Sequence, residues 1–213
     1  DLNNENLEAL KAGLPNLLRH VDNIQSVFGL PCVVAINRFP SDTEAELDLI
    51  ASECEKLGVN VKLSEVWAKG GEGALELADE VMRLVDEPSE LRFAYEDGAD
   101  IADALESIAT KVYRADGVDF TPAAKRQLAE LRANGFGNLP VCVAKTQYSF
   151  SDNASMLGAP ENFRITVREL KVSAGAHFVV ALTGSVLTMP GLPKVPAAEG
   201  IDVDDDGVIT GLF

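Results

Sequence analysis

Apolar residues in the first third of the chain recur with two periods, which indicate helices alternating with strands. Residues 14–28 carry apolar side chains at intervals of three and four, with Pro15 tolerated in a first turn and Gly29 placed to end the helix. Residues 31–36 form an unbroken apolar run with β-branched side chains, which is typical of a parallel strand buried on both faces. We therefore expect a helix over 14–28 that leads into a buried strand.

The next residues complete a strand–helix–strand unit. Thr43 and Glu46 have the spacing of a capping box that starts a helix, and Gly58 is placed to end it. Residues 59–63 alternate between apolar and polar side chains, as a strand does. Residues 31–63 therefore predict a βαβ unit whose two strands run parallel.

The rest of the chain shows helical patterns followed by strand patterns. A helix opens after the glycine-rich residues 70–73, and its apolar face would consist of Leu77, Val81, Leu84 and Val85. The run at 139–144 echoes the one at 31–36 without a constant repeat period, so we expect a third buried strand of similar role and not a repeat protein. The other expected elements are a connection at 86–96, helices at 101–112 and 121–134, strands at 165–172 and 178–182, and an irregular Pro/Gly-rich stretch at 189–196.

These elements predict an α/β protein with a mostly parallel sheet and flanking helices. We expect a βαβ-containing region over residues 1–85, a helical segment over 86–136, and a strand-rich C-terminal region with an irregular tail over 137–213. Because no clear linker separates them, the three parts could also form one compact unit.

Composition is that of a folded globular chain, and the charge is strongly acidic. Hydrophobic residues make up 46% of the 213 residues and charged ones 24%. No apolar run is long enough for a membrane helix, the N-terminus lacks the features of a targeting signal, and Cys32 and Cys142 lie in apolar runs where cysteine acts as a small core residue. We therefore expect a cytoplasmic protein with no membrane partner. The net charge of −16 repels a phosphate backbone, so nucleic acid is not an expected partner.

Two aromatic residues follow the ends of the expected parallel strands. Phe39 lies just past the strand at 31–36, and Trp67 lies just past the strand at 59–63. Ligands of open parallel sheets bind outside the carboxyl ends of the strands, so both side chains should reach one crevice. A flat heterocycle between them would gain about 0.5–1.5 kcal/mol from each stacking contact beyond the buried area. From the pattern alone, Trp67 would also fit an ordinary core aromatic.

The strings that hold these aromatics are CVVAINRFPSDTEAE and SEVWAKGGEGALELA, and further characteristic strings are LPVCVAKTQYSFSDN, FRITVRELKVSAGA, FVVALTGSVLTMPGLPKVPAAEGIDVD and the closing GLF. Together they resemble formate–tetrahydrofolate ligase, also called formyltetrahydrofolate synthetase, over essentially the whole chain. That family uses a Phe and a Trp at this spacing to hold the pterin ring of its folate substrate. The resemblance therefore implies that Phe39 and Trp67 form a pterin slot.

The resemblance also implies an ATP-dependent reaction. Formate would be phosphorylated to formyl phosphate, and the formyl group would pass to tetrahydrofolate to give 10-formyltetrahydrofolate, with Mg²⁺ accompanying ATP and a monovalent cation as activator. The family has a P-loop NTPase-like architecture with its phosphate loop upstream of this region, and no GxxxxGK[ST] motif occurs in these 213 residues. We expect the C-terminal part of a homotetrameric enzyme, which needs its N-terminal portion and is inactive alone.

Other residues at the same strand ends are candidate nucleotide or substrate contacts. Asn37 begins a string that resembles the guanine-reading Asn-Lys-x-Asp of GTPases, but Pro40 stands where the Asp belongs, so an adenine contact or a structural turn are alternatives. Residues 69–74 place glycines before a helix N-terminus, which favours anions, although a tight turn is the simpler interpretation. The candidates are Asn37, Pro40, Glu65, Lys69 and Gly71.

Acidic residues near the C-terminus do not predict a metal site. Asp202, Asp204 and Asp206 fit the start of a calcium loop, but Phe213 stands where the loop needs a bidentate Glu. A solvated acidic turn is therefore expected. No cluster of His, Cys or carboxylate residues supports a zinc site or a catalytic triad, so we assign no metal ligand.

Three other positions need an explanation. His20 should be a surface residue on a charged helix. His177 stands where the family usually has Gly, which puts in doubt any close backbone approach at that point. Residues 145–147 end the strand at 139–144 and could edge the same crevice as the aromatics, or Lys145 could pair with a carboxylate.

Two other classes of function stay open. A GTPase-like or regulatory nucleotide-binding module without ligase chemistry would explain the Asn37-Arg38 strand end. An inactive folded chain that serves as a binding or assembly domain would explain the missing phosphate loop. A phosphate loop with formate-site residues in the upstream sequence would argue against the first alternative, and formate-dependent phosphate release by the chain alone would exclude the second.

Overall fold

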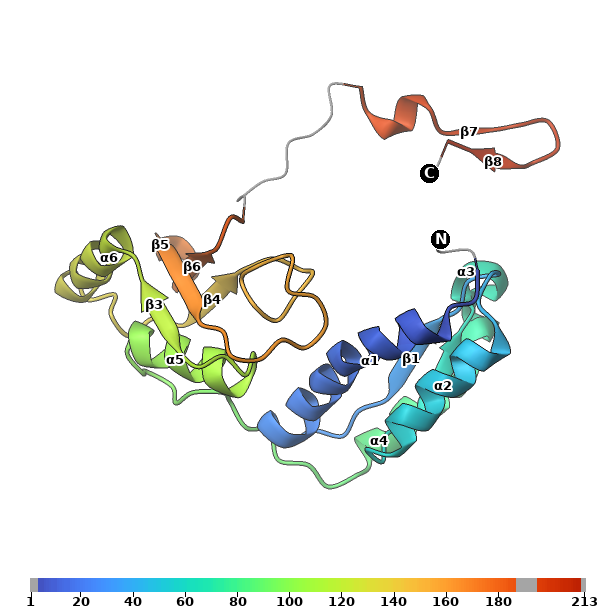
Figure 1. Ribbon diagram of the computed structural model, residues 1–213, viewed down its shortest axis with the longest axis horizontal. Coiled ribbons are helices and arrows are strands. Elements are labelled where there is room, and N and C mark those ends of the chain that lie inside the picture. The colour runs from blue at the N-terminus through green and yellow to red at the C-terminus, as the bar shows by residue number, and fades with distance from the viewer. Residues whose placement is uncertain (1–3, 187–194, 212–213) are drawn as a thin grey trace.

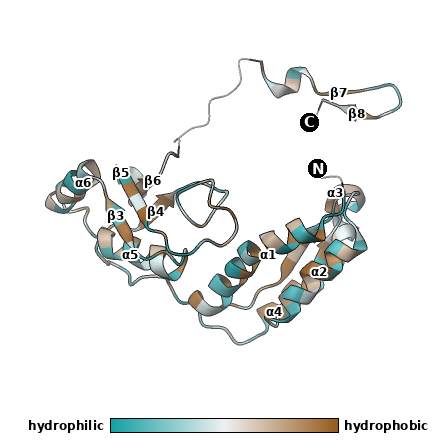
Figure 2. Cartoon of the chain, in the orientation of Figure 1, coloured by the Kyte–Doolittle hydropathy of each residue, from teal (hydrophilic) through white to brown (hydrophobic). Residues whose placement is uncertain are grey.

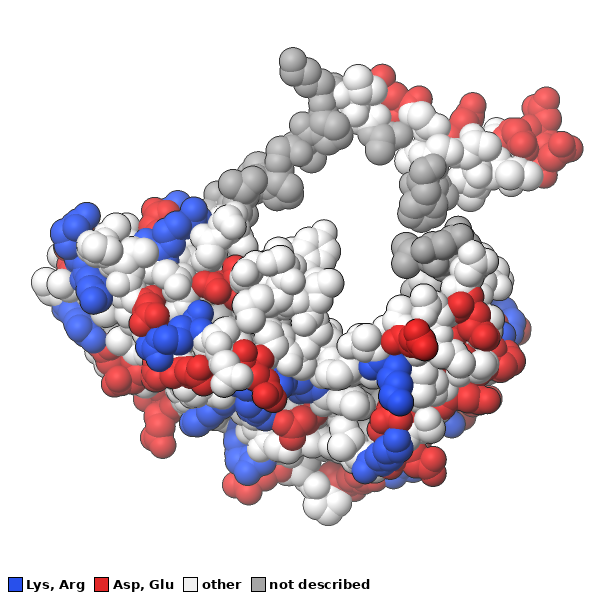
Figure 3. Space-filling view, viewed as in Figure 1, with Lys and Arg blue, Asp and Glu red and all other residues white. Residues whose placement is uncertain are grey.

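A computed structural model describes residues 4–186 and 195–211 and shows two lobes joined side by side (Figure 1). The first lobe, blue to cyan, holds a small sheet between helices. The second lobe, green to orange, holds a larger sheet with two helices on it. On the face seen in Figure 3, Asp and Glu are spread over both lobes and over the C-terminal hairpin.

The first helix begins earlier than the sequence pattern predicts. Helix α1 (Leu7–Asp22) continues into a short π-helix, η1 (Asn23–Val27), and Pro15 lies inside α1 instead of in its first turn. The start was predicted wrongly because the proline resembles a helix boundary, whereas Asn6 is the residue that caps the helix through its side chain. Gly29 ends the helical segment with φ of 69°, as expected.

The βαβ unit is confirmed. Strands β1 (Val34–Asn37) and β2 (Val61–Ser64) pair in parallel, and α2 (Glu44–Glu55) connects them. The side chain of Thr43 accepts the backbone N–H of Glu46 while the Glu46 carboxylate accepts the N–H of Thr43, so the capping box is present.

One face of this sheet packs on α1 and α2, but β1 is not buried on both faces. On the opposite face, α4 packs mainly against β2 and leaves Ala35 and Asn37 of β1 exposed. The expected burial of both faces of this strand is therefore wrong. The core of the lobe consists of Val21, Cys54 and Val59, with Leu17, Leu18, Cys32, Val34, Ile50 and Val61 packed around them.

Two short helices, α3 (Val66–Lys69) and the 3-10 helix η2 (Gly70–Ala74), lead from β2 to α4 (Leu75–Val85). The apolar face expected for α4 is only partly correct, since Val81 and Val85 are exposed. Leu77 and Leu84 turn inward as expected, together with Glu80, and the helix leaves a stripe of apolar side chains on its outer side. The stripe consists of Leu75, Ala78, Val81, Met82 and Val85.

The inward-facing Glu80 carboxylate provides a pH-dependent contribution to stability. Arg83 donates two hydrogen bonds to it and Asn60 one, and these bonds lower the pKa of Glu80 from 4.5 to about 2. A carboxyl whose pKa is lower in the folded state stabilises the fold above its unfolded pKa and loses that effect as pH falls through the folded pKa. In urea unfolding, we expect the stability advantage of the unmodified chain over Glu80→Gln to be constant above pH 4.5 and to vanish between 4.5 and about 2. An advantage that does not change with pH would contradict this assignment.

The second lobe holds a mixed sheet in the order β3-β5-β6-β4. Strand β3 (Val118–Phe120) pairs in parallel with β5 (Ile165–Ser173), and β4 (Val141–Ala144) pairs in parallel with β6 (Phe178–Thr183). The central pair, β5 and β6, is antiparallel, so the sheet is only partly parallel. The run at 139–144 is a strand as expected, but it belongs to this sheet and not to the sheet of β1. The three-residue β3 was not predicted, because it is too short to show a period.

Helices α5 (Ile101–Lys111) and α6 (Pro122–Ala133) confirm the two helical predictions, and Thr121 caps α6 as its hydroxyl accepts a backbone N–H. Cys142 is exposed, contrary to the expected core role, whereas Cys54 is fully buried. Figure 2 shows apolar residues along the strands that face the helices. The shared core consists of Ile101, Leu105, Ala109, Ala115, Val118, Ala124, Leu128, Leu131, Phe163, Ile165, Val167, Leu170, Val179 and Ala181.

His177 follows a short 3-10 helix, η3 (Ala174–Ala176), in the left-handed region with φ of 57° and ψ of 45°. Gly adopts this conformation without strain, whereas a residue with a side chain is strained there. We expect His177→Gly to raise the free energy of unfolding by about 0.5–1 kcal/mol, because relief of the strain exceeds the extra entropy of glycine in the unfolded chain. Urea denaturation measures the change, and a lower stability of the variant would contradict the strain.

Contacts of α1 and η1 with the second lobe join the two lobes. His20 is exposed as expected, and its ring lies 4.6 Å from the ring of Phe150. Side chains of α1 and η1 also bond to the second lobe directly. These bonds join Arg19 to the carbonyls of Tyr113 and Pro160, Asn23 to the carbonyl of Val112, and Asp22 to Arg114.

The C-terminal residues form a 3-10 turn, η4 (Ala197–Glu199), and a hairpin of β7 (Asp202–Val203) and β8 (Ile209–Thr210). The Asp204 carboxylate accepts the backbone N–H groups of Asp206 and Val208, so the expected solvated acidic turn is confirmed. The hairpin itself was not predicted.

Part of the expected irregular stretch, 189–194, lies outside the described residues, as does Phe213. Within residues 4–186 and 195–211, no helix combines the length and the apolar character needed to cross a membrane.

Candidate functional site

The two strands of the first lobe end at the same edge. Asn37, the last residue of β1, pairs with Ser64, the last residue of β2, and the backbone N–H of Arg38 donates to the carbonyl of Ser64 at 3.1 Å. The chain therefore leaves both strands side by side. Phe39 and Trp67 follow these ends, and both are well exposed, at 56% and 61%.

Trp67 is tied to the loop that carries Phe39. Its indole Nε1–H donates to the carbonyl oxygen of Arg38 at 2.9 Å, so the ring lies beside the residue that precedes Phe39. The interpretation of Trp67 as a core aromatic is wrong, because most of its side chain faces solvent. The structure thus brings together the two segments that carry the aromatic residues.

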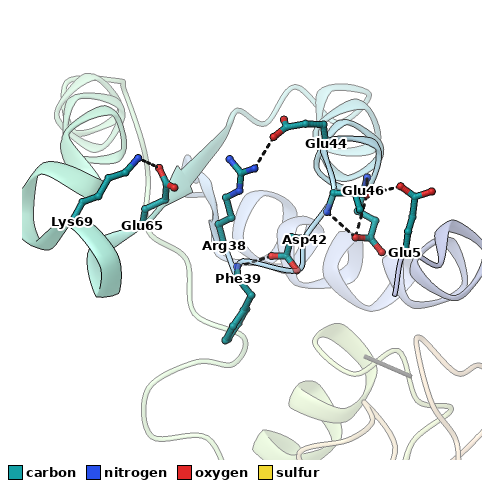
Figure 4. A network of polar contacts seen from close by, with 9 residues as sticks. Glu5, Arg38, Phe39, Asp42, Glu44, Glu46, Glu65 and Lys69 are labelled. Carbon is teal, nitrogen blue, oxygen red and sulfur yellow. Dashed lines mark hydrogen bonds and ion pairs between the residues drawn. The ribbon is translucent and has the colours of Figure 1, made fainter. Parts of the chain in front are cut away.

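Phe39 lies in a tight turn closed by Asp42. The backbone N–H of Phe39 donates to the Asp42 carboxylate at 2.7 Å, and the N–H of Asp42 donates to the Phe39 carbonyl at 3.1 Å. Pro40 takes the second position of this turn, where its fixed φ is favoured. In Figure 4 the Phe39 ring points away from the neighbouring polar network.

The charged candidates form ion pairs beside the aromatics (Figure 4). Lys69 donates to Glu65 at 2.5 Å, and Arg38 donates to Glu44 at 2.6 Å. The hydrogen bond from Lys69 and the positive charges of Lys69 and Arg38 lower the pKa of Glu65. Glu65 and Lys69 also line a cavity of about 350 Å³. An anion that approached Lys69 would have to displace this carboxylate.

The glycines after Trp67 differ in their surroundings. Gly71 has no heavy atom within 4 Å of the position of an added Cβ, whereas such a Cβ on Gly73 would lie 2.5 Å from the carbonyl carbon and oxygen of Glu65. The N–H of Glu65 donates to the Gly73 carbonyl at 2.9 Å. The segment is therefore a tight turn packed on the start of α3.

Residues 145–147 do not edge the same crevice, because β4 belongs to the second sheet. Lys145 lines a separate cavity of about 390 Å³ beside β4 and β6. Its ammonium donates to the carbonyls of Thr146 and Ser149 and lies 5.4 Å from the centre of the Tyr113 ring. Burial lowers the pKa of Lys145. The lysine holds its own loop together.

The family model of formate–tetrahydrofolate ligase matches residues 1–213, which is the whole chain. The chain belongs to this family. Membership implies the substrates of a ligase that joins formate to tetrahydrofolate with ATP, and it favours this chemistry over a GTPase-like module.

A resident metal ion in a protein is held by a group of His, Cys, Asp or Glu side chains. Among residues 4–186 and 195–211, no group of three or more His, Cys, Asp or Glu side chains could hold one. We therefore assign no step of the reaction to a metal ion held by these residues.

Two residues that contact the aromatic segments carry no clear signal of this role in the sequence pattern. Asp42 was not singled out, although Phe39-Pro-Ser-Asp42, with Pro in second place, is a recognisable turn signal. Gly73 belongs to the glycine-rich string at residues 70–73. Its close approach to Glu65 depends on how the turn folds back, which the sequence does not show.

Proposed function

We propose that this chain supplies the folate slot of a formate–tetrahydrofolate ligase, with the pterin ring held between Phe39 and Trp67. The observation that carries the proposal is the tie between the two segments: the indole of Trp67 bonds to the carbonyl of Arg38, directly before Phe39. Both rings are exposed at the carboxyl edge of a parallel strand pair, where ligands of α/β sheets bind.

In the proposed reaction, formate takes the terminal phosphoryl group of ATP to give formyl phosphate. A nitrogen of tetrahydrofolate then attacks the formyl carbon, phosphate leaves, and 10-formyltetrahydrofolate forms. The contribution of Phe39 and Trp67 is to bind and orient the folate, so that its nitrogen meets the formyl group in a productive geometry. Asn37, Pro40, Glu65, Lys69 and Gly71 are proposed as further substrate or nucleotide contacts at the same edge.

The proposal places the ATP phosphates on an N-terminal portion of the same enzyme, with a P-loop NTPase-like architecture and a phosphate loop. Two surfaces of the first lobe support such a partner. The outer stripe of α4 exposes Leu75, Met82 and Val85 at 62%, 66% and 71%, and one face of β1 carries the exposed residues Ala35 and Asn37. We also propose that the enzyme is a cytoplasmic homotetramer, that ATP binds together with Mg²⁺, and that a monovalent cation activates the enzyme.

Tetrahydrofolate titration tests the slot directly, because Trp67 is the only tryptophan of the chain. We expect tetrahydrofolate to quench the Trp67 emission in a saturable manner, and ATP to leave it unchanged. N-acetyltryptophanamide titrated in parallel corrects for light absorbed by the folate. An emission that follows this free indole at every folate concentration would refute the slot.

A further inference from the structure

The turn that holds Gly73 supports the segment that carries Trp67. Strand β2 ends at Ser64, and Glu65 is the first residue after it. The N–H of Glu65 donates to the Gly73 carbonyl, and the α-carbon of Gly73 packs against the Glu65 peptide so closely that a Cβ would lie 2.5 Å from two of its atoms and 2.9 Å from the nitrogen of Val66. A methyl group here requires the backbone just before Trp67 to move.

A side chain at position 73 is excluded by the packing around Gly73 and not by an unusual backbone conformation. Gly70 has a positive φ of 59°, which favours glycine whatever surrounds it, but an added Cβ would meet nothing within 4 Å. Gly73 has no positive φ, and its neighbours are backbone atoms that cannot rotate away. Substitution at this position therefore acts on the segment of Trp67.

Asp42 supports the segment that carries Phe39, as Gly73 supports the segment that carries Trp67. Its carboxylate accepts the N–H of Phe39 and its own N–H donates to the Phe39 carbonyl, so both peptide groups of Phe39 are fixed. The next residue, Thr43, is the N-cap of α2, which anchors the turn to the body of the lobe. The backbone that carries the Phe39 ring is thereby held against the start of α2.

The two supported segments meet at the bond between the Trp67 indole and the Arg38 carbonyl. Each ring thus has its own backbone support, and one hydrogen bond joins the two. Walls that are ordered before the ligand arrives bind it more tightly, because less conformational freedom is lost on binding.

We propose that Gly73 and Asp42 are positioning residues that set the separation and angle of the Phe39 and Trp67 rings for a flat heterocyclic substrate. The proposal rests on the function proposed above and adds the residues that determine the shape of the slot. Neither residue needs to touch the substrate.

The test compares Gly73→Ala with Gly13→Ala, which adds the same methyl group to an exposed position of α1 where nothing lies within 4 Å. We expect Gly73→Ala to shift the emission maximum of Trp67 without ligand and to raise the Kd for tetrahydrofolate about tenfold. Gly13→Ala should match the unmodified chain in both measurements. Far-UV circular dichroism checks that each variant is folded.

A second pair of variants tests Asp42 and decides the matter if Gly73→Ala does not fold. We expect Asp42→Ala to raise the Kd for tetrahydrofolate about fivefold, and Asp42→Asn to restore most of the affinity, because an amide oxygen still accepts the N–H of Phe39. A residue that only stabilised the fold would lower the melting temperature without this difference in affinity.

The outcomes separate the two proposals. If the unmodified chain does not bind tetrahydrofolate, the proposed slot is wrong and the positioning role falls with it. If the unmodified chain binds, and folded Gly73→Ala and Asp42→Ala bind equally well with unchanged Trp67 emission, the slot stands and the positioning role alone is overturned.

Discussion

Replacement of Trp67 by alanine in the proposed formate–tetrahydrofolate ligase is expected to raise the KM for tetrahydrofolate by about 10- to 100-fold and to leave the KM for ATP within about twofold. The change removes one wall of the proposed slot, whose ring face and apolar area are worth about 1.5–3 kcal/mol to a stacked heterocycle. Each 1.4 kcal/mol corresponds to about a factor of ten in affinity. Steady-state kinetics with each substrate varied in turn measures both constants.

Matched variants make the result specific. Phe39→Ala should show the same selective effect on tetrahydrofolate, since it removes the opposite wall. Phe93→Ala removes an aromatic side chain that is even more exposed, at 76%, but lies on the connection between the lobes, so it should leave both constants unchanged. A folate constant that stays at its original value in Trp67→Ala would rule out the slot.

Leu105→Ala is expected to lower the free energy of unfolding of the second lobe by about 2–5 kcal/mol. Leu105 is 2% exposed and lies on α5 in the core shared with α6 and the mixed sheet, so its truncation leaves a cavity. Thermal denaturation followed by circular dichroism measures the loss. Leu91→Ala, at a position that is 55% exposed, should change the stability little.

The same variant tests the domain division. Trp67 lies in the first lobe, so its emission reports the unfolding of that lobe alone. We expect Leu105→Ala to shift the circular dichroism transition while the Trp67 transition stays near its original temperature. Because the helices of residues 86–136 and the strands after residue 137 share one core, we expect these two parts to unfold together. Coincident shifts of both probes would show instead that the chain unfolds as one unit.

Local signals in the sequence were sufficient for the βαβ unit. The capping box of Thr43 and Glu46, the stop at Gly58 and the alternation after it all act within a few residues, so they can be recognised without knowledge of the fold. The placement of β4 could not be predicted in this way. Its apolar run is almost the same as that of β1, and only pairing with β6, far along the chain, decides which sheet it joins.

The candidate site shows the same limit. Phe39 and Trp67 could be singled out because each follows a strand pattern and lies in a characteristic string. That they lie on linked segments depends on the bond from Trp67 to Arg38, and the role of Gly73 depends on a close approach to Glu65. Both are contacts between separate turns, which no pattern of spacing reveals. The exposed face of α4 was missed because Glu80, and not Val81 or Val85, turns inward.

The bond between Trp67 and the Arg38 carbonyl also limits what the slot can recognise. An indole has one hydrogen-bond donor and no acceptor, and here the Arg38 carbonyl already occupies it. Phe39 has neither. The side chains of Phe39 and Trp67 can thus contact an incoming ring only through their flat faces. Such contacts bind similar ring systems with similar affinity, whatever substituents the ligand ring carries. Discrimination among such rings, for example by oxidation state or by amino and oxo substituents, has to come from polar groups around the rim of the slot.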